Sequence, residues 1–159
     1  MQTVFAIELA YTRSEFPDLF ELLAGQSGGC DIFGPFLIVG SRADADFFKE
    51  VTNAADSFVD SHELLSDGCF IPLELFSDYG FQTNTSTYLF KESLSCFRIA
   101  SGGKTERGMA LLELDEILIA SWDDHGHIHF FVDEFQKDLV LGLAKAYDIE
   151  VSFLHLDKY

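Results

Sequence analysis

The sequence predicts an α+β protein: a mostly antiparallel sheet of about six to eight strands, with two or three helices packed on one face. The second half of the chain contains many short segments rich in β-branched and aromatic residues, separated by turn residues. A few longer stretches show the apolar spacing of helices. Apolar residues make up 48% of the 159 residues, and seventeen are Phe. This composition is sufficient for the core of a single globular domain over residues 1–159.

The first forty residues predict a strand, a helix and a second strand. Residues 3–10 alternate apolar and polar side chains, as a half-buried strand does. Helical spacing follows over 14–24, where a serine at the start can cap the helix. Gly28-Gly29 is expected to open a turn. The apolar run 32–39 predicts a strand that is broken or edged at Pro35.

Residues 42–66 are predicted to form one long helix, or two helices with a break. Ser41 and Asp44 have the S-x-x-D spacing of a capping box. Apolar residues then recur at helical spacing as far as Leu65, and Gly68 is expected to end the helix. Acidic residues fall on the opposite side at spacings of four, three and four. This predicted acidic ridge consists of Asp56, Asp60, Glu63 and Asp67.

The second half is predicted to be mainly strands, followed by one helix. Asp133 can cap a helix that runs to Tyr147, with Phe135 and Val140 facing inward. Residues 150–156 are expected to close the chain as a strand. The other predicted strands are 69–76, 86–91, 94–100, 109–114, 117–122 and 128–133.

Net charge is the extreme feature of the composition. The chain has 27 acidic and 10 basic residues, which gives a formal charge of −17. Binding to nucleic acid requires Lys and Arg to neutralise phosphates, so we expect no direct binding to nucleic acid. Binding to an anionic membrane surface is disfavoured for the same reason. A basic protein partner is the natural complement, although high acidity also serves solubility.

The sequence predicts a cytoplasmic protein. No apolar run approaches the roughly 20 residues of a membrane span, and no signal peptide is visible at the start. The cysteines Cys30, Cys69 and Cys96 are odd in number and lack a CxxC spacing. We therefore expect reduced and buried thiols.

The acidic ridge is the leading candidate for a partner-binding site. No Lys or Arg occurs between Lys49 and Lys91. An ordinary helix surface mixes charges of both signs, because like charges one turn apart repel. Acids near a helix C-terminus are also disfavoured by the helix dipole. This argues for a role outside folding, although a merely solvated face remains the alternative. The predicted partner-binding residues are Asp56, Asp60, Glu63, Asp67, Glu74 and Asp78.

In size and charge the chain resembles the small acidic immunity proteins and nucleic-acid mimics that block toxic nucleases or defence enzymes. The resemblance rests on length and charge, and no motif accompanies it. The acidic surface itself predicts a binding or inhibitor protein that neutralises a basic partner by charge complementarity, with no catalytic residues and no cofactor.

A small metal- or His-dependent enzyme is the alternative function. His125, His127 and His129 alternate beside Asp123, so a strand would place the three imidazoles on one face. Imidazole and carboxylate groups on one face could hold zinc, or supply an acid or base. Apolar residues occupy the opposite face at the same period. The histidines therefore fit the solvent side of an amphipathic strand equally well.

A partial match to the phosphate-binding loop motif occurs at Ser101-Gly102-Gly103-Lys104-Thr105. The last residues of the motif are present, but its first glycine is not. Arg98 stands where the motif requires its first glycine. The motif also needs a following helix, whereas the residues after Thr105 predict a strand. We therefore expect a glycine turn here and no bound nucleotide.

Overall fold

The computed structural model describes residues 1–26 and 29–159 and confirms the α+β class. Within these ranges, eleven strands form two antiparallel sheets, where the sequence predicted one. The turn expected at Gly28-Gly29 falls partly outside the described residues. Of the helices that are described, none has both the length and the apolar character needed to cross a membrane.

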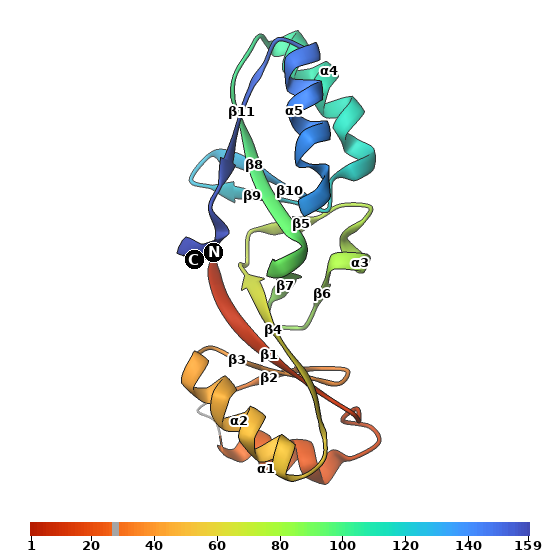
Figure 1. Ribbon diagram of the computed structural model, residues 1–159, viewed down its shortest axis with the longest axis vertical. Helices are drawn as coiled ribbons and strands as arrows, with labels where there is room; N and C mark the ends of the chain where they lie inside the picture. Colours follow the sequence, from red (N-terminus) through yellow and green to blue (C-terminus); the bar gives the residue numbers. More distant parts are fainter. Residues whose placement is uncertain (27–28) are drawn as a thin grey trace. The chain divides into compact units, whose positions relative to one another are not determined.

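The chain divides into two compact units, and neither is a continuous stretch of sequence. Unit 1 contains Met1–Asp67 and Gln82–Glu92, and unit 2 contains Gly68–Phe81 and Ser93–Tyr159. Each unit has its own sheet and its own helices (Figure 1). Whether the two unfold together, as the single domain over 1–159 requires, stays a prediction.

Unit 1 is built on strands in the order β2-β3-β1-β4-β7, and β6 (Gly80–Gln82), which contains the unit boundary, comes next. Strands β2, β3, β1, β4 and β7 pair with their neighbours in antiparallel fashion. The strand expected over 32–39 is interrupted at Gly34 and Pro35, as predicted, and forms the hairpin β2–β3. The elements are β1 (Gln2–Leu9), α1 (Pro17–Gln26), β2 (Asp31–Phe33), β3 (Phe36–Val39), α2 (Arg42–Ala54), β4 (Phe58–Ser66) and β7 (Thr87–Phe90).

Helices α1 and α2 bury their apolar sides against one face of this sheet. Phe20 of α1 and Phe48 of α2 are fully buried beside Ile7 and Leu37 of the strands. The predicted cap at the start of α2 is confirmed, since the Ser41 hydroxyl accepts a hydrogen bond from the Asp44 amide at 3.1 Å. Burying each such aromatic side chain contributes about 1.5–3 kcal/mol to stability.

The prediction of a helix through residue 66 is wrong, because α2 ends at Ala54. Asp56 adopts a left-handed conformation with φ 52°, which reverses the chain direction. The Ser57 amide then donates to the Thr52 carbonyl at 2.9 Å, and the Asp56 amide donates to the Asn53 carbonyl at 3.1 Å. These two bonds form a Schellman motif, which satisfies the last helix carbonyls. Glycine usually occupies the left-handed position that follows a helix. An aspartate occupies it here, so the sequence pattern did not indicate that α2 ends at this point.

Unit 2 is built on strands in the order β11-β8-β10-β9-β5, again with antiparallel pairing. Helices α4 and α5 lie side by side and cover one face (Figure 1). Its elements are β5 (Phe70–Pro72), α3 (Phe76–Tyr79), β8 (Leu94–Ser101), α4 (Lys104–Leu114), β9 (Ala120–Asp124), β10 (His127–Asp133), α5 (Lys137–Ala146) and β11 (Glu150–Leu154).

The strand expected over 109–114 is wrong, because these residues belong to α4. Met, Ala, Leu and Glu fill this segment, and all are strong helix formers. Ala110 and Leu114, four residues apart, are buried on the same side of the helix. In α5, Val140 is buried as expected. Phe135 is 87% exposed, because it lies in a short turn before the helix begins.

Candidate functional site

The structure does not place the predicted acidic ridge on a helix, and the six predicted partner-binding residues are divided between the two units. Asp56 lies in the turn after α2, while Asp60 and Glu63 lie on β4 and Asp67 follows its end. Glu74 and Asp78 belong to unit 2 and are exposed there. The prediction that the acidic ridge forms one face of a helix is therefore wrong. A partner-binding role for these residues stays a prediction.

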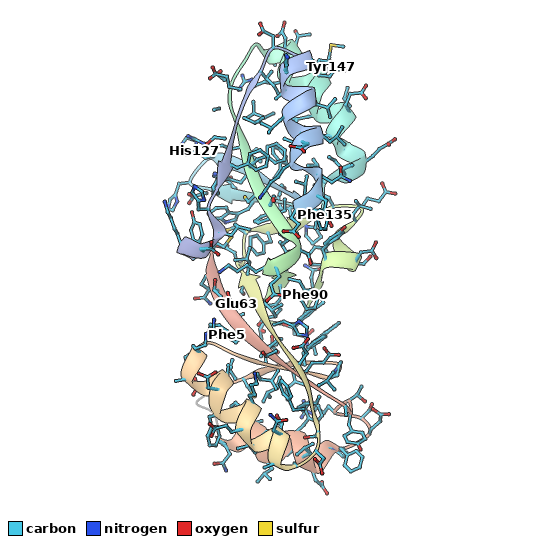
Figure 2. All side chains as sticks on the ribbon, viewed as in Figure 1. Phe5, Glu63, Phe90, His127, Phe135 and Tyr147 are labelled. Atoms are coloured by element: carbon cyan, nitrogen blue, oxygen red, sulfur yellow. The ribbon has the colours of Figure 1, made fainter. Side chains whose placement is uncertain are left out.

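Two residues of the predicted ridge are engaged in ion pairs inside unit 1. The Glu63 carboxylate pairs with both Arg42 and Lys91, and the distance to the Lys91 Nζ is 3.1 Å. The hydrogen bond from Lys91, together with both positive charges, holds the pKa of Glu63 below its ordinary value despite partial burial. Figure 2 shows Glu63 near Phe5, its partner across the β1–β4 ladder. Asp67 pairs with the amino group of Met1.

An acidic patch forms instead on strands β3, β1 and β4. Phe36, Glu8 and Asp60 stand opposite one another across these three strands. Neighbouring side chains opposite each other in a ladder are close together, so Glu8 and Asp60 repel. His62 lies two residues after Asp60, on the same face, and its Nε2 is 2.9 Å from the Glu8 carboxylate.

Aromatic rings border this patch. The His62 ring makes edge contacts with Phe36 and with Phe90, with centroid distances of 5.8 and 5.5 Å. Phe36 and Phe90 also contact each other at 5.8 Å. All three rings are half-buried. We define the β1–β4 patch as Glu8, Phe36, Asp60, His62 and Phe90.

Sequence reasoning identified Asp60 but missed Glu8 and the aromatic residues of the patch. Glu8 stands on the face of β1 opposite Phe5, Ile7 and Leu9, so the alternation already placed it away from that apolar side. Its position opposite Asp60 depends on the pairing of β1 with β4, which lies more than 50 residues away in sequence. No local pattern indicates such a pairing.

Asp31 shows how a carboxylate of unit 1 can be satisfied by hydroxyl groups. Its side chain accepts hydrogen bonds from Thr83, Thr85 and Tyr88, at 2.5, 2.6 and 3.0 Å. Partial burial acts to raise the pKa of Asp31, but the hydroxyl hydrogen bonds outweigh it and hold the pKa below its ordinary value. This cluster ties the β2–β3 hairpin to β7 and to the segment before it.

The alternative site at Asp123–His129 forms the β9–β10 hairpin. Asp123 accepts a hydrogen bond from the Gly126 amide at 2.6 Å, and His125 sits in the turn with φ 53°. His129 is buried against Trp122, and this burial lowers its pKa. His127, labelled in Figure 2, is exposed. Among the described residues, no three His, Cys, Asp or Glu side chains are grouped so that they could hold a metal.

The segment at Gly102 differs from the expected glycine turn between strands. Strand β8 ends at Ser101, and helix α4 begins at Lys104. Gly102 has φ 130°, and a Cβ there would lie 2.6 Å from Ile149 Cγ2, so glycine is required. A strand and a following helix are therefore present, but the first glycine of a phosphate-binding loop is still replaced by Arg98.

The cysteines differ in environment. Cys96 is buried, and burial raises the pKa of its thiol to about 12. Cys30 is half-buried and Cys69 is exposed, so the expectation of a buried thiol is wrong for Cys69.

Comparisons of the chain with protein-family models, with curated proteins and with solved structures found no match.

Proposed function

We propose that the chain is an acidic binding protein that engages a basic protein partner through the β1–β4 patch and through Asp56, which is exposed in the turn before β4. The observation that carries this proposal is the direct opposition of Glu8 and Asp60 on paired strands. Like charges in this arrangement destabilise a sheet. His62 already contacts the Glu8 carboxylate, so a cation from a partner would reduce the remaining cost mainly by binding the Asp60 carboxylate.

The distribution of cations in unit 1 supports this proposal. Unit 1 has thirteen Asp and Glu residues but four Lys and Arg residues. Two of these cations, Arg42 and Lys91, bind the same carboxylate, Glu63. Among the described residues, neither Asp56 nor Asp60 forms an ion pair, and both are exposed.

The chemistry of the patch favours arginine as the contacting residue of the partner. A guanidinium group can pair with a carboxylate and also stack on an aromatic ring. Phe36 stands opposite Glu8 and contacts Phe90, so the patch offers two half-buried rings. Aromatic residues surrounded by polar groups are typical of binding hot spots.

The kind of partner is part of the same proposal. A nuclease-type toxin or a nucleic-acid-binding enzyme carries a cationic groove for phosphates. An acidic protein seated in that groove would block it, which is the action of an immunity protein or a nucleic-acid mimic. Such an encounter would take place in the cytoplasm, where the sequence predicts this protein to be.

The experiment compares two variants with the same change of net charge. Asp56→Asn/Asp60→Asn removes charge at the proposed interface, and Asn tolerates the left-handed conformation at residue 56. Asp115→Asn/Glu116→Gln removes two exposed charges in unit 2. A partner captured by the wild-type protein from its native cells is purified, and its binding kinetics are measured at two salt concentrations.

We expect association with the Asp56→Asn/Asp60→Asn variant to slow by about tenfold or more at low salt, because electrostatic steering acts on the association rate. The unit 2 variant should associate almost as fast as the wild-type protein. The melting temperature of the first variant should stay unchanged or rise, since the repulsion between Glu8 and Asp60 is relieved. Equal kinetics for the two variants would remove the support for this interface.

A further inference from the structure

Unit 2 contains a cavity that is positively charged although the protein is acidic. The cavity has a volume of about 450 Å³ and lies where the start of α4 meets strands β8 and β10. Three of the ten Lys and Arg residues of the chain line it, namely Arg98, Lys104 and Arg107. We call these three residues the cationic rim. No Asp or Glu is among the described residues that line the cavity.

The cationic rim is not neutralised from within unit 2. Among the described residues, none of its three side chains forms an ion pair with a carboxylate. Charges of like sign that line one cavity repel one another.

The remaining surface of the cavity is mainly apolar. Ile99 of β8, Leu111 of α4, and Ile128 and Phe130 of β10 form what we call the apolar wall. Small-molecule sites typically have volumes of about 300–1,000 Å³ and combine apolar walls with a few placed polar groups. The cavity has this size and this combination.

The N-terminus of α4 is not itself the anion site. A Cβ placed on Gly103 would lie 2.0 Å from Glu106 Oε2, so the Glu106 carboxylate folds back over the first turn of the helix. A carboxylate in this position already interacts with the positive end of the helix dipole. The positive charge available to a ligand therefore comes from the side chains of the cationic rim.

We propose that this cavity binds a small organic anion that carries an apolar body. The cationic rim holds its phosphate or carboxylate group, because guanidinium groups bind the oxygens of both in a bidentate manner. The apolar body lies against the apolar wall. This site is separate in composition from the β1–β4 patch, since its lining residues belong to unit 2 and those of the patch to unit 1.

The experiment uses the full chain and four probes at low ionic strength. Phenyl phosphate and phenylacetate carry an anionic group on an aromatic body, inorganic phosphate lacks the body, and benzyl alcohol lacks the charge. Amide chemical shifts of the ¹⁵N-labelled protein report both affinity and location. We expect saturable shifts with phenyl phosphate or phenylacetate at residues 104–111 and 126–130, and the stronger of the two identifies the preferred anionic group.

Two variants with equal changes in net charge test the role of the cationic rim. Lys104→Gln/Arg107→Gln changes exposed helix positions in the rim, and Lys137→Gln/Lys145→Gln changes exposed positions on α5 outside the cavity. The first variant should bind the aromatic anion about tenfold more weakly or worse, and the second should bind it like the wild-type protein. Both variants should retain the dispersed spectrum of the folded chain.

Four outcomes would overturn the proposal. These are no shifts at the cavity with either aromatic anion, equal losses of affinity in the two variants, equal binding of benzyl alcohol, and equal binding of inorganic phosphate. The first excludes the site, and the second reduces the effect to net charge. The third excludes a role for the anionic group, and the fourth excludes a role for the apolar body.

Discussion

The two units share one architecture but use their cations in opposite ways. Each is an antiparallel sheet with a pair of helices on one face. In unit 1, Arg42 and Lys91 converge on the Glu63 carboxylate, whereas Glu8 and Asp60 face each other across two strands. In unit 2, three cations converge on a cavity whose described lining contains no carboxylate.

This difference shows that net charge is a poor guide to the electrostatic potential at a given site. The chain carries −17 overall, and each unit has more acidic than basic residues. The local potential depends on which charges are paired and which are left exposed. A strongly acidic protein can therefore present an acidic interface on one unit and an anion-binding cavity on the other.

The largest expected effect tests whether the two units unfold independently. Phe20 in unit 1 and Phe97 in unit 2 are both fully buried. Replacing either with Ala should lower the free energy of unfolding by about 3–5 kcal/mol, because a cavity is left in the core. Trp122, the only Trp, reports on unit 2. If the chain is a single domain, Phe20→Ala should shift the urea midpoint of Trp122 fluorescence as far as Phe97→Ala does.

An unshifted Trp122 transition in Phe20→Ala, with a lowered midpoint by circular dichroism, would contradict the single domain. The two units would then unfold separately.

An intermediate effect is expected at the ion-pair centre of unit 1. Glu63→Gln should lower the free energy of unfolding at pH 7 by about 1–2 kcal/mol, because Arg42 and Lys91 lose their shared carboxylate. The folded pKa of Glu63 lies below its ordinary value of 4.5. Its contribution is therefore present above pH 4.5 and is lost as the pH falls through the lower folded pKa.

Urea unfolding of Glu63→Gln and of the wild-type protein at pH 7 and at pH 3 checks the direction of this pH dependence. Glu92→Gln, a change at an exposed position, serves as the control. The stability difference should shrink at pH 3. A difference that is constant with pH would mean that the carboxylate charge is not responsible.

The smallest effect concerns a buried histidine of unit 2. Burial lowers the folded pKa of His129 from its ordinary value of 6.5. The unfolded chain therefore takes up the proton first as the pH falls, so the contribution is present above pH 6.5 and decreases below it. His129→Gln should lose less stability between pH 7 and pH 5 than the wild-type protein, as measured by Trp122 fluorescence. An equal loss would assign the pH dependence to other groups.

The prediction of the fold succeeded where local signals were unambiguous. The α+β class, the cap at Ser41 and the interruption at Pro35 are confirmed. Helices α2 and α5 end with the same Schellman motif, with Asp56 and Asp148 in the left-handed position. The predicted end of α5 differs from the observed end by one residue. In contrast, α2 was predicted to continue for twelve residues beyond its observed end. The end of β4 is buried on both faces, so its residues are apolar at consecutive positions. Some of these apolar residues fall at helical spacing from those of α2, which extended the predicted helix.

The candidate sites were predicted less well than the fold, the β1–β4 patch because it depends on pairing between distant strands and the cationic rim because α4 was not predicted. Asp60 was identified from sequence, but its opposition to Glu8 requires the register of β1 with β4. The cationic rim combines Arg98 on β8 with Lys104 and Arg107 on α4, where a glycine turn followed by a strand over 109–114 was predicted. A turn would have placed those two side chains differently from a helix.

The interleaved chain path of the two units has a consequence for synthesis on the ribosome. Unit 1 needs Gln82–Glu92, which is made only after the first residues of unit 2. Until Thr87–Phe90 emerges, the edge of β4 at Leu64 and Leu65 lacks its partner strand β7. An unpaired apolar edge is a template for pairing with another chain. A protein cut after Asp67 would keep that edge permanently open, so we expect such a fragment to aggregate rather than to fold as half of the molecule.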